Sequence, residues 1–122
     1  MPRHRPDAVD SLYILCEQNY NAAVPALLTA LNNRTDKRLR ESAIFLLGNL
    51  GDEHVLPHLL SALANEENIF DRINHAEFAA AFYDVGEAAL KPMLAFWRCK
   101  DTPAYTRLVA GTFLKHYLAK PL

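Results

Sequence analysis

His54 and His58 are the two residues whose type and spacing come closest to a metal site. Four residues apart on one helix, their imidazoles would share a face and could reach a common ion. A metal centre needs further ligands, and the nearest acids, Asp52 and Glu53, are placed to cap the helix instead. We therefore expect solvated or capping histidines and no metal, and we keep both as candidate contacts to a partner.

An aromatic group near the C-terminal end is the main candidate for a binding surface. It consists of Met93, Phe96, Trp97 and Arg98. Aromatic residues together with Met and Arg are typical of the residues that dominate binding energy at protein interfaces. The alternative is that Phe96 and Trp97 pack against the terminal helix through Tyr105 or Leu108, because a lone tryptophan in a small domain is usually at least half-buried.

Four basic side chains gather at one predicted helix start: Arg34, Lys37, Arg38 and Arg40. A nucleic-acid interface would need a continuous positive surface to offset phosphate charge. The formal net charge of the chain is -1, and acids interrupt the basic group in sequence. We therefore expect a solvated helix start, with Arg40 paired to an acid such as Asp52 or Asp84, and consider nucleic acid an unlikely partner.

The sequence shows no catalytic constellation. It contains no glycine-rich phosphate loop, no nucleophile elbow and no cysteine–histidine spacing typical of a metal site. The carboxylates Glu77, Asp84 and Glu87 are expected to be wet. Cys16 and Cys99 are too few and too far apart for a disulfide framework, so free thiols are expected. The sequence thus predicts a protein that is not an enzyme and holds no cofactor.

The composition is that of an ordinary soluble protein. The chain has 122 residues, 51% of them hydrophobic and 22% charged, which suits a single domain covering 1–122. Its longest apolar run is too short to span a membrane, and the basic segment 1–6 is followed by no apolar signal core. We therefore expect a cytoplasmic protein without a membrane partner.

The prolines reveal the elements that would position these side chains. Pro25, Pro57 and Pro92 are separated by 32 and 35 residues, and each is followed two residues later by leucine. Six residues before them stand Asn19, Gly51 and Gly86, the residue types that tolerate the left-handed backbone closing a helix. The same helix–turn–helix unit is therefore predicted three times.

The expected fold is all-α, without strands, because no segment alternates apolar and polar residues for long enough. First helices are predicted at about 7–18, 36–50, 70–85 and 103–118, and second helices at about 21–32, 53–64 and 88–99. This gives repeats at about 7–32, 36–64 and 70–99 plus the terminal helix 103–118, or about three and a half helical hairpins. The predicted N-caps are Asp7, Asp36, Asp52 and Thr102.

The second unit resembles a HEAT repeat of the short bacterial type found in phycobilisome lyases. The resemblance is carried by Arg40, Ala43, Leu47, Gly48, Leu50, Gly51, Asp52, Pro57, Leu59 and Leu63. It implies an α-α superhelix, or HEAT-like solenoid, with first helices on the outer convex side and second helices lining the inner concave side. The third unit departs from the pattern, with His75 in the arginine place. Iron-binding HEAT-like hydroxylases use adjacent His-Glu pairs, but here Ala76 separates His75 from Glu77, which excludes that activity.

Members of such families are mostly scaffolds, so we expect a non-catalytic protein–protein interaction module that binds through its concave face or an exposed repeat end. The resemblance also leaves a phycobilin lyase-like or other chromophore-handling factor as an alternative, in which Arg98, Lys100 and His58 would hold propionates. A nucleic-acid-binding HEAT-like protein is the weaker alternative.

The terminal helix suggests self-association or a hetero-complex, because it has more apolar residues than one face can bury internally. These are Leu108, Val109, Phe113, Leu114, Tyr117 and Leu118. Alternatively, the helix turns its apolar side inward and leaves Tyr117 at the rim.

Overall fold

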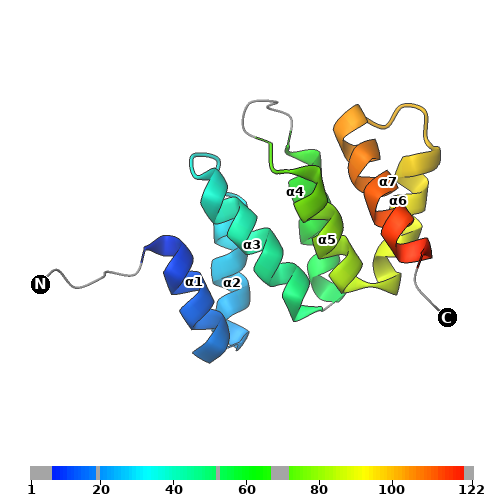
Figure 1. Ribbon diagram of the computed structural model, residues 1–122. Helices are drawn as coiled ribbons and strands as arrows, with labels where there is room; N and C mark the ends of the chain where they lie inside the picture. Colours follow the sequence, from blue (N-terminus) through cyan, green and yellow to red (C-terminus); the bar gives the residue numbers. More distant parts are fainter. Residues whose placement is uncertain (1–6, 19, 52, 67–71, 120–122) are drawn as a thin grey trace, which may run out of the picture.

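The computed structural model describes residues 7–18, 20–51, 53–66 and 72–119. These residues form helices and no strand, which confirms the all-α prediction (Figure 1). The elements are α1 (Ala8–Gln18), α2 (Tyr20–Leu31), α3 (Lys37–Leu50), the 3-10 helix η1 (Glu53–Val55), α4 (Leu56–Ala64), α5 (His75–Val85), α6 (Glu87–Arg98) and α7 (Ala104–Leu118).

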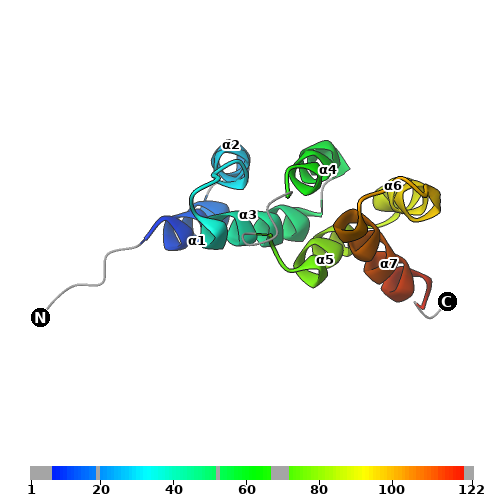
Figure 2. The ribbon, with the colours of Figure 1, turned by 90° about the horizontal axis from the view of Figure 1, so that it is seen from above.

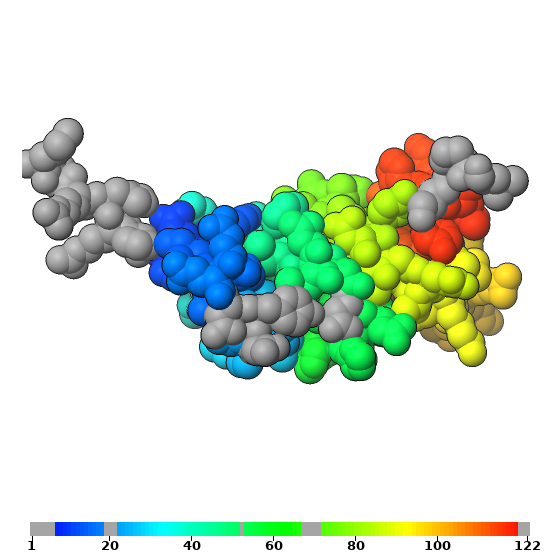
Figure 3. Space-filling model, turned by 90° about the horizontal axis from the view of Figure 1, so that it is seen from below, coloured from blue at the N-terminus to red at the C-terminus, as the bar shows by residue number. Residues whose placement is uncertain are grey.

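The helices stack in two rows. Figure 2 shows the first helices α1, α3, α5 and α7 in one row and the second helices α2, α4 and α6 in the other. The blue N-terminal and red C-terminal parts occupy opposite ends of the stack in the space-filling view from below (Figure 3). This is the architecture of a helical repeat protein, in which each unit buries its apolar face against its neighbours.

Local chemistry explains where the best-defined helix begins and ends. Asp36 caps α3, with its side chain accepting a hydrogen bond from the amide of Leu39. Gly51 closes α3 in a left-handed conformation with φ of 63°, and its amide donates to the carbonyl of Gly48 at 2.9 Å. Gly86 closes α5 with φ of 89°. The predicted turn glycines are thus confirmed, while Asn19 lies outside the described residues.

The three prolines fall in the first two turns of their second helices. Pro57 is in the first turn of α4, whereas Pro25 and Pro92 lie further inside α2 and α6. In α2 and α6 a turn of α-helix precedes the proline. In the second unit the 3-10 helix η1 takes the place of that turn. The repeat predicted from the proline spacing is therefore present, with a tighter start in the second unit.

One predicted helix start and one predicted N-cap were wrong. The third unit begins its helix at His75, where the Asn74 side chain accepts from the Ala76 amide at 2.8 Å, and not near residue 70. Pro103, not Thr102, precedes the first residue of α7, since proline keeps the residue before it out of the helical region. Asp7 does act as predicted, accepting from the Asp10 amide at 2.8 Å. Asp52 lies outside the described residues.

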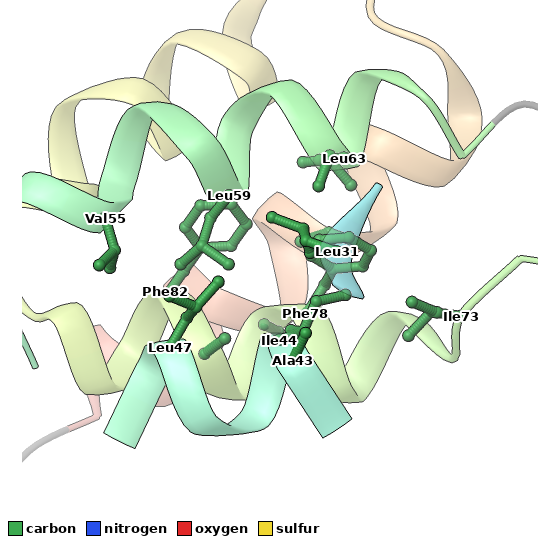
Figure 4. Close-up of a cluster of buried hydrophobic side chains, with 14 of the residues drawn as sticks. Leu31, Ala43, Ile44, Leu47, Val55, Leu59, Leu63, Ile73, Phe78 and Phe82 are labelled. Carbon is green, nitrogen blue, oxygen red and sulfur yellow. The ribbon is translucent and has the colours of Figure 1, made fainter. Parts of the chain in front are cut away.

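The core runs between the two rows and is built largely from leucine and phenylalanine (Figure 4). Phe78 and Phe82 of α5 stack with ring centroids 6.3 Å apart beneath Leu59 and Leu63 of α4. In the third unit Ala89 and Met93 of α6 are fully buried, while Leu90 and Leu94 are only half-buried.

The first helices pack more closely on one another than the second helices do. α3 lies against α5 and α5 against α7, whereas α2, α4 and α6 make few contacts among themselves. Small residues permit this approach, because a Cβ added at Gly48 would stand only 2.8 Å from the Cα of Ala81. The closer packing thus lies in the row that the resemblance placed on the outer side.

Candidate functional site

The surface of the first-helix row is hollowed across α1, α3 and α5. The hollow measures about 420 Å³, within the range of sites that take small ligands or side chains. It is lined by Tyr13, Glu41, Ser42, Phe45, Ala76, Glu77, Ala80, Ala81 and Asp84.

Two further hollows adjoin it. One, of about 320 Å³, lies between α5 and α7 and shares Ala76, Ala80 and Asp84 with the first. The other, of about 270 Å³, lies between α1 and α3 and shares Tyr13. The three hollows adjoin one another through these shared lining residues and together reach all four first helices. We call this surface the first-helix groove.

Alanines on α5 form the floor of the groove. Ala76 and Ala80 line both central hollows, while Ala79 and Ala81 each line one of them. Ala79 and Ala81 are buried, whereas Ala76 and Ala80 are exposed. A helix with methyl side chains at successive positions is narrow, so its larger neighbours on α3 and α7 stand above it.

Two aromatic rings border the N-terminal half of the groove. Tyr13 of α1 and Phe45 of α3 are 39% and 52% exposed, and their ring centroids are 6.4 Å apart. Exposed aromatic pairs of this kind are typical anchors at protein interfaces, because they offer a large apolar area that loses little side-chain entropy.

The charge of the groove is negative. Glu17, Glu41, Glu77 and Asp84 line the three hollows, and none of the described lining residues is Lys or Arg. Lys37 stands 3.8 Å from Glu41 as its ion-pair partner. The pKa of Glu77 is raised by partial burial and then by the nearby Glu41 carboxylate, with Lys37 acting in the opposite direction. The two carboxylates therefore repel each other at neutral pH.

The structure divides the predicted aromatic cluster. Met93 is fully buried and cannot contact a partner, because the α6 register turns it into the core. Phe96 is half-buried against the core, and Arg98 is exposed. Trp97 is 50% exposed and lies over Gly111 of α7, where an added Cβ would stand 2.8 Å from the ring. Its contact with α7 is thus at Gly111, whereas Tyr105 or Leu108 was expected.

A separate hollow of about 430 Å³ opens beside Trp97 at the end of the stack. We call it the C-terminal hollow; it is lined by Leu94, Trp97, Arg98, Gly111, Leu114, Lys115 and Leu118. Its walls are apolar, and its two charged lining residues are basic.

His54 and His58 lie apart from all four hollows. His54 belongs to η1 and His58 to α4, and both are exposed. Among the described residues, no group of three or more His, Cys, Asp and Glu side chains could hold a metal ion. The part of the chain that is described also has Cys16 and Cys99 as free thiols.

The basic side chains at the start of α3 form ion pairs with acidic side chains. Arg38 lies 3.2 Å from Asp7, and Lys37 lies 3.8 Å from Glu41. Arg40 is fully buried and pairs with Glu66, and among the described residues no ion pair joins it to Asp84. Asp52, the other expected partner, lies outside the described residues. The side chain of Glu66 approaches it from the connection after α4, a position that repeat spacing alone does not reveal.

Sequence reasoning missed the first-helix groove, although a signal was present. The equivalent first-helix positions in the four units are Ala8, Arg40, His75 and Arg107. Five residues after them stand Tyr13, Phe45, Ala80 and Thr112, which all line the groove. Aligning the four first helices therefore identifies one face. It was overlooked because the resemblance directed attention to the second helices.

None of the helices in the described segments has the length and apolar character needed to cross a membrane.

Comparison with known families matches residues 8–81, more than half of the chain, to HEAT repeats. No curated protein and no solved structure matches the chain. The matched residues span the first two hairpins and most of α5, which are the elements that stack in the structure. The chain therefore belongs to the HEAT-repeat family.

Proposed function

We propose that this protein is a non-catalytic interaction module that holds a segment of another protein in the first-helix groove. HEAT repeats generally mediate protein–protein interaction, since stacked helical units create extended binding surfaces. The observation that carries the proposal is the row of three adjoining hollows across the four first helices, bordered by the exposed rings of Tyr13 and Phe45.

The charge of the groove favours a protein segment over the anionic alternatives. A nucleic acid or a tetrapyrrole would bring phosphates or propionates close to Glu41, Glu77 and Asp84, where like charges repel. A peptide can instead place a cation or an amide beside these carboxylates.

Chromophore handling is the second candidate, and the C-terminal hollow favours it. There Arg98 and Lys115 stand beside the apolar walls and the Trp97 ring, so an anionic aromatic ligand would find charge and stacking together. Incubation with a free bilin tests this reading: a shift of the visible spectrum that is lost in Arg98→Ala supports it, and an unchanged spectrum removes it.

Site-specific photo-crosslinking tests the leading proposal. Phe45 is replaced by p-benzoylphenylalanine, and the protein is illuminated in extract of its own source cells. Ser61, an exposed residue on the second helix α4, carries the same group in the control. A discrete adduct at Phe45 that is absent at Ser61 supports the groove. Equal adducts at both positions, or no adduct at Phe45 in a folded protein, overturn it.

A further inference from the structure

The hollow of the groove that spans α1, α3 and α5 carries three carboxylates that its own residues do not neutralise fully. Glu41, Glu77 and Asp84 line one hollow spanning α1, α3 and α5. Glu41 is paired with Lys37, but in the part of the chain that the structure describes, Glu77 and Asp84 form no ion pair. An acidic surface with one compensating cation attracts positive charge from solution or from a partner.

Glu41 of α3 and Glu77 of α5 line the same hollow. The raised pKa of Glu77 has burial as its first cause and the Glu41 carboxylate as its second, and Lys37 is the cation that opposes them. An added cation between these carboxylates would relieve their repulsion. It would also gain two charge-assisted hydrogen bonds.

An apolar surface lies beside the carboxylates in the same hollow. Phe45 and Tyr13 present exposed rings, and the methyl groups of Ala76 and Ala80 form the adjacent floor. A long basic side chain has an apolar stem and a charged end, so it matches a surface in which apolar and acidic groups adjoin. An Arg or Lys could in addition lie over one of the aromatic rings.

From this juxtaposition we propose that the occupant of the groove is a partner segment in which Lys or Arg adjoins a bulky apolar residue. The cation lies between Glu41 and Glu77, and the apolar side chain packs on Phe45 and Tyr13. This inference rests on the proposed function and specifies the chemistry of the partner.

A second copy of this chain is the competing occupant. The C-terminal hollow presents Arg98 and Lys115 beside Trp97 and Leu118, which is the same combination of basic and apolar groups. Such a contact would be head-to-tail and would not form a symmetric dimer, so it would produce rings or open chains of molecules. The test must therefore separate it from a foreign segment.

A peptide-display library provides the first readout. Random peptides are selected on the full chain and, in parallel, on Glu41→Gln/Glu77→Gln. The control is Glu53→Gln/Glu87→Gln, which removes the same charge from exposed positions on η1 and α6 outside the groove. Circular dichroism verifies that all three proteins are folded. We expect Lys or Arg beside a bulky apolar residue to be enriched on the parent chain and the control, but not on the groove variant.

A resynthesised winning peptide provides the second readout, by fluorescence anisotropy. The Kd should rise at least tenfold in Glu41→Gln/Glu77→Gln and in Phe45→Ala, and change less than twofold in the control. Selection of neutral or acidic peptides, no selection, or equal binding to the groove variant overturns the inference. So does self-association that is abolished both by Lys115→Glu and by Glu41→Gln/Glu77→Gln, which would identify a second copy as the occupant. Crosslinking at Phe45 is independent of these charges, so it can succeed while the basic motif fails.

Discussion

Arg40 and Glu66 form an ion pair inside the protein, with 3.4 Å between Nε of Arg40 and Oε1 of Glu66. Both side chains are almost completely withdrawn from solvent. Arg40 also donates to the carbonyl of Asn33 at 3.0 Å, and the second oxygen of Glu66 accepts from the amide of Ile73 at 3.2 Å. The pair thus ties α3 to the connection before it and to the connection that leads into α5.

The network extends to the last helix. The Tyr105 hydroxyl of α7 donates to the carbonyl of Ile73, and Arg72 lies 4.8 Å from the centroid of the Tyr105 ring. Burial is the main cause that raises the pKa of Tyr105, followed by the negative charge of Glu66. Polar contacts thereby join three successive repeats along the edge where α3, α5 and α7 begin. The turn glycines Gly51 and Gly86 lie at the opposite ends of α3 and α5. These contacts hold the first helices in register.

Breaking one side of the Arg40–Glu66 pair should destabilise the protein strongly. Either Arg40→Met or Glu66→Gln is expected to lower the free energy of unfolding by about 3–5 kcal/mol, because the remaining group loses its buried partner. Urea denaturation followed by circular dichroism measures the loss. The double variant Arg40→Met/Glu66→Met should cost less than the sum of the single changes, since it removes both charges of the pair together. Single variants that lose less than about 1 kcal/mol would contradict this role.

Two helical glycines should respond differently to alanine. In Gly48→Ala the new methyl would meet the backbone of Ala81 at 2.8 Å, and a backbone atom can move only if α3 and α5 separate. We expect a net loss of about 1–2 kcal/mol, because the strain exceeds the gain of about 1 kcal/mol in helix propensity.

Gly111→Ala is the matched comparison. Its methyl would meet the ring of Trp97 at the same 2.8 Å, but that ring is half-exposed and can rotate toward solvent. Stability should stay within about 0.5 kcal/mol of the parent. The fluorescence of Trp97, the only tryptophan in the chain, should shift to the red. Equal destabilisation by both substitutions would contradict the claim that the close backbone approach of α3 and α5 makes Gly48 less tolerant of a methyl group than Gly111.

The repeat could be predicted from sequence because it depends on local chemistry. Gly51, Gly86 and Asp36 act through their own backbone or a neighbouring amide, so their roles are visible within a few residues. The Glu66 side chain could not be assigned as the partner of Arg40, because a distant contact depends on the path of a connection. The groove depends on which row packs more closely, and Gly48 determines this only together with Ala81 on another helix.

The raised pKa of Glu77 predicts a pH-dependent stability change. A carboxyl group whose pKa is higher in the folded protein than the unfolded value of 4.5 binds its proton more tightly when folded. Its contribution to stability is therefore present below pH 4.5 and is lost as the pH rises through the raised value. Glu77→Gln should match the parent near pH 4 and exceed it at pH 7. We expect a gain of about 0.3 kcal/mol, or roughly 1–2 °C in Tm, because the side chain is exposed.

Thermal unfolding at the two pH values measures this difference. Glu87→Gln, an exposed glutamate on α6 outside the groove, is the control and should show no such pH dependence. If Glu77→Gln is less stable than the parent at pH 7, the carboxylate is stabilised by a contact and the repulsion from Glu41 does not dominate. A gain in stability together with weaker partner binding would mean that the groove keeps a destabilising charge for recognition.

The C-terminal end of the stack should mediate association. Leu118 is 69% exposed in the last turn of α7 and lines the C-terminal hollow with Trp97. Leu108, also on α7, is 49% exposed. Leu118→Glu should leave the unfolding free energy nearly unchanged, because an exposed side chain contributes little to it. The same change should abolish a dimer or hetero-complex, since it places a charge in the apolar contact.

Light scattering from about 10 µM to about 1 mM, the range in which weak complexes form, measures the molecular mass of the parent chain and of Leu118→Glu. A parent chain that stays monomeric throughout and binds no partner through this end would show that Trp97 and Leu118 close the stack without further cover.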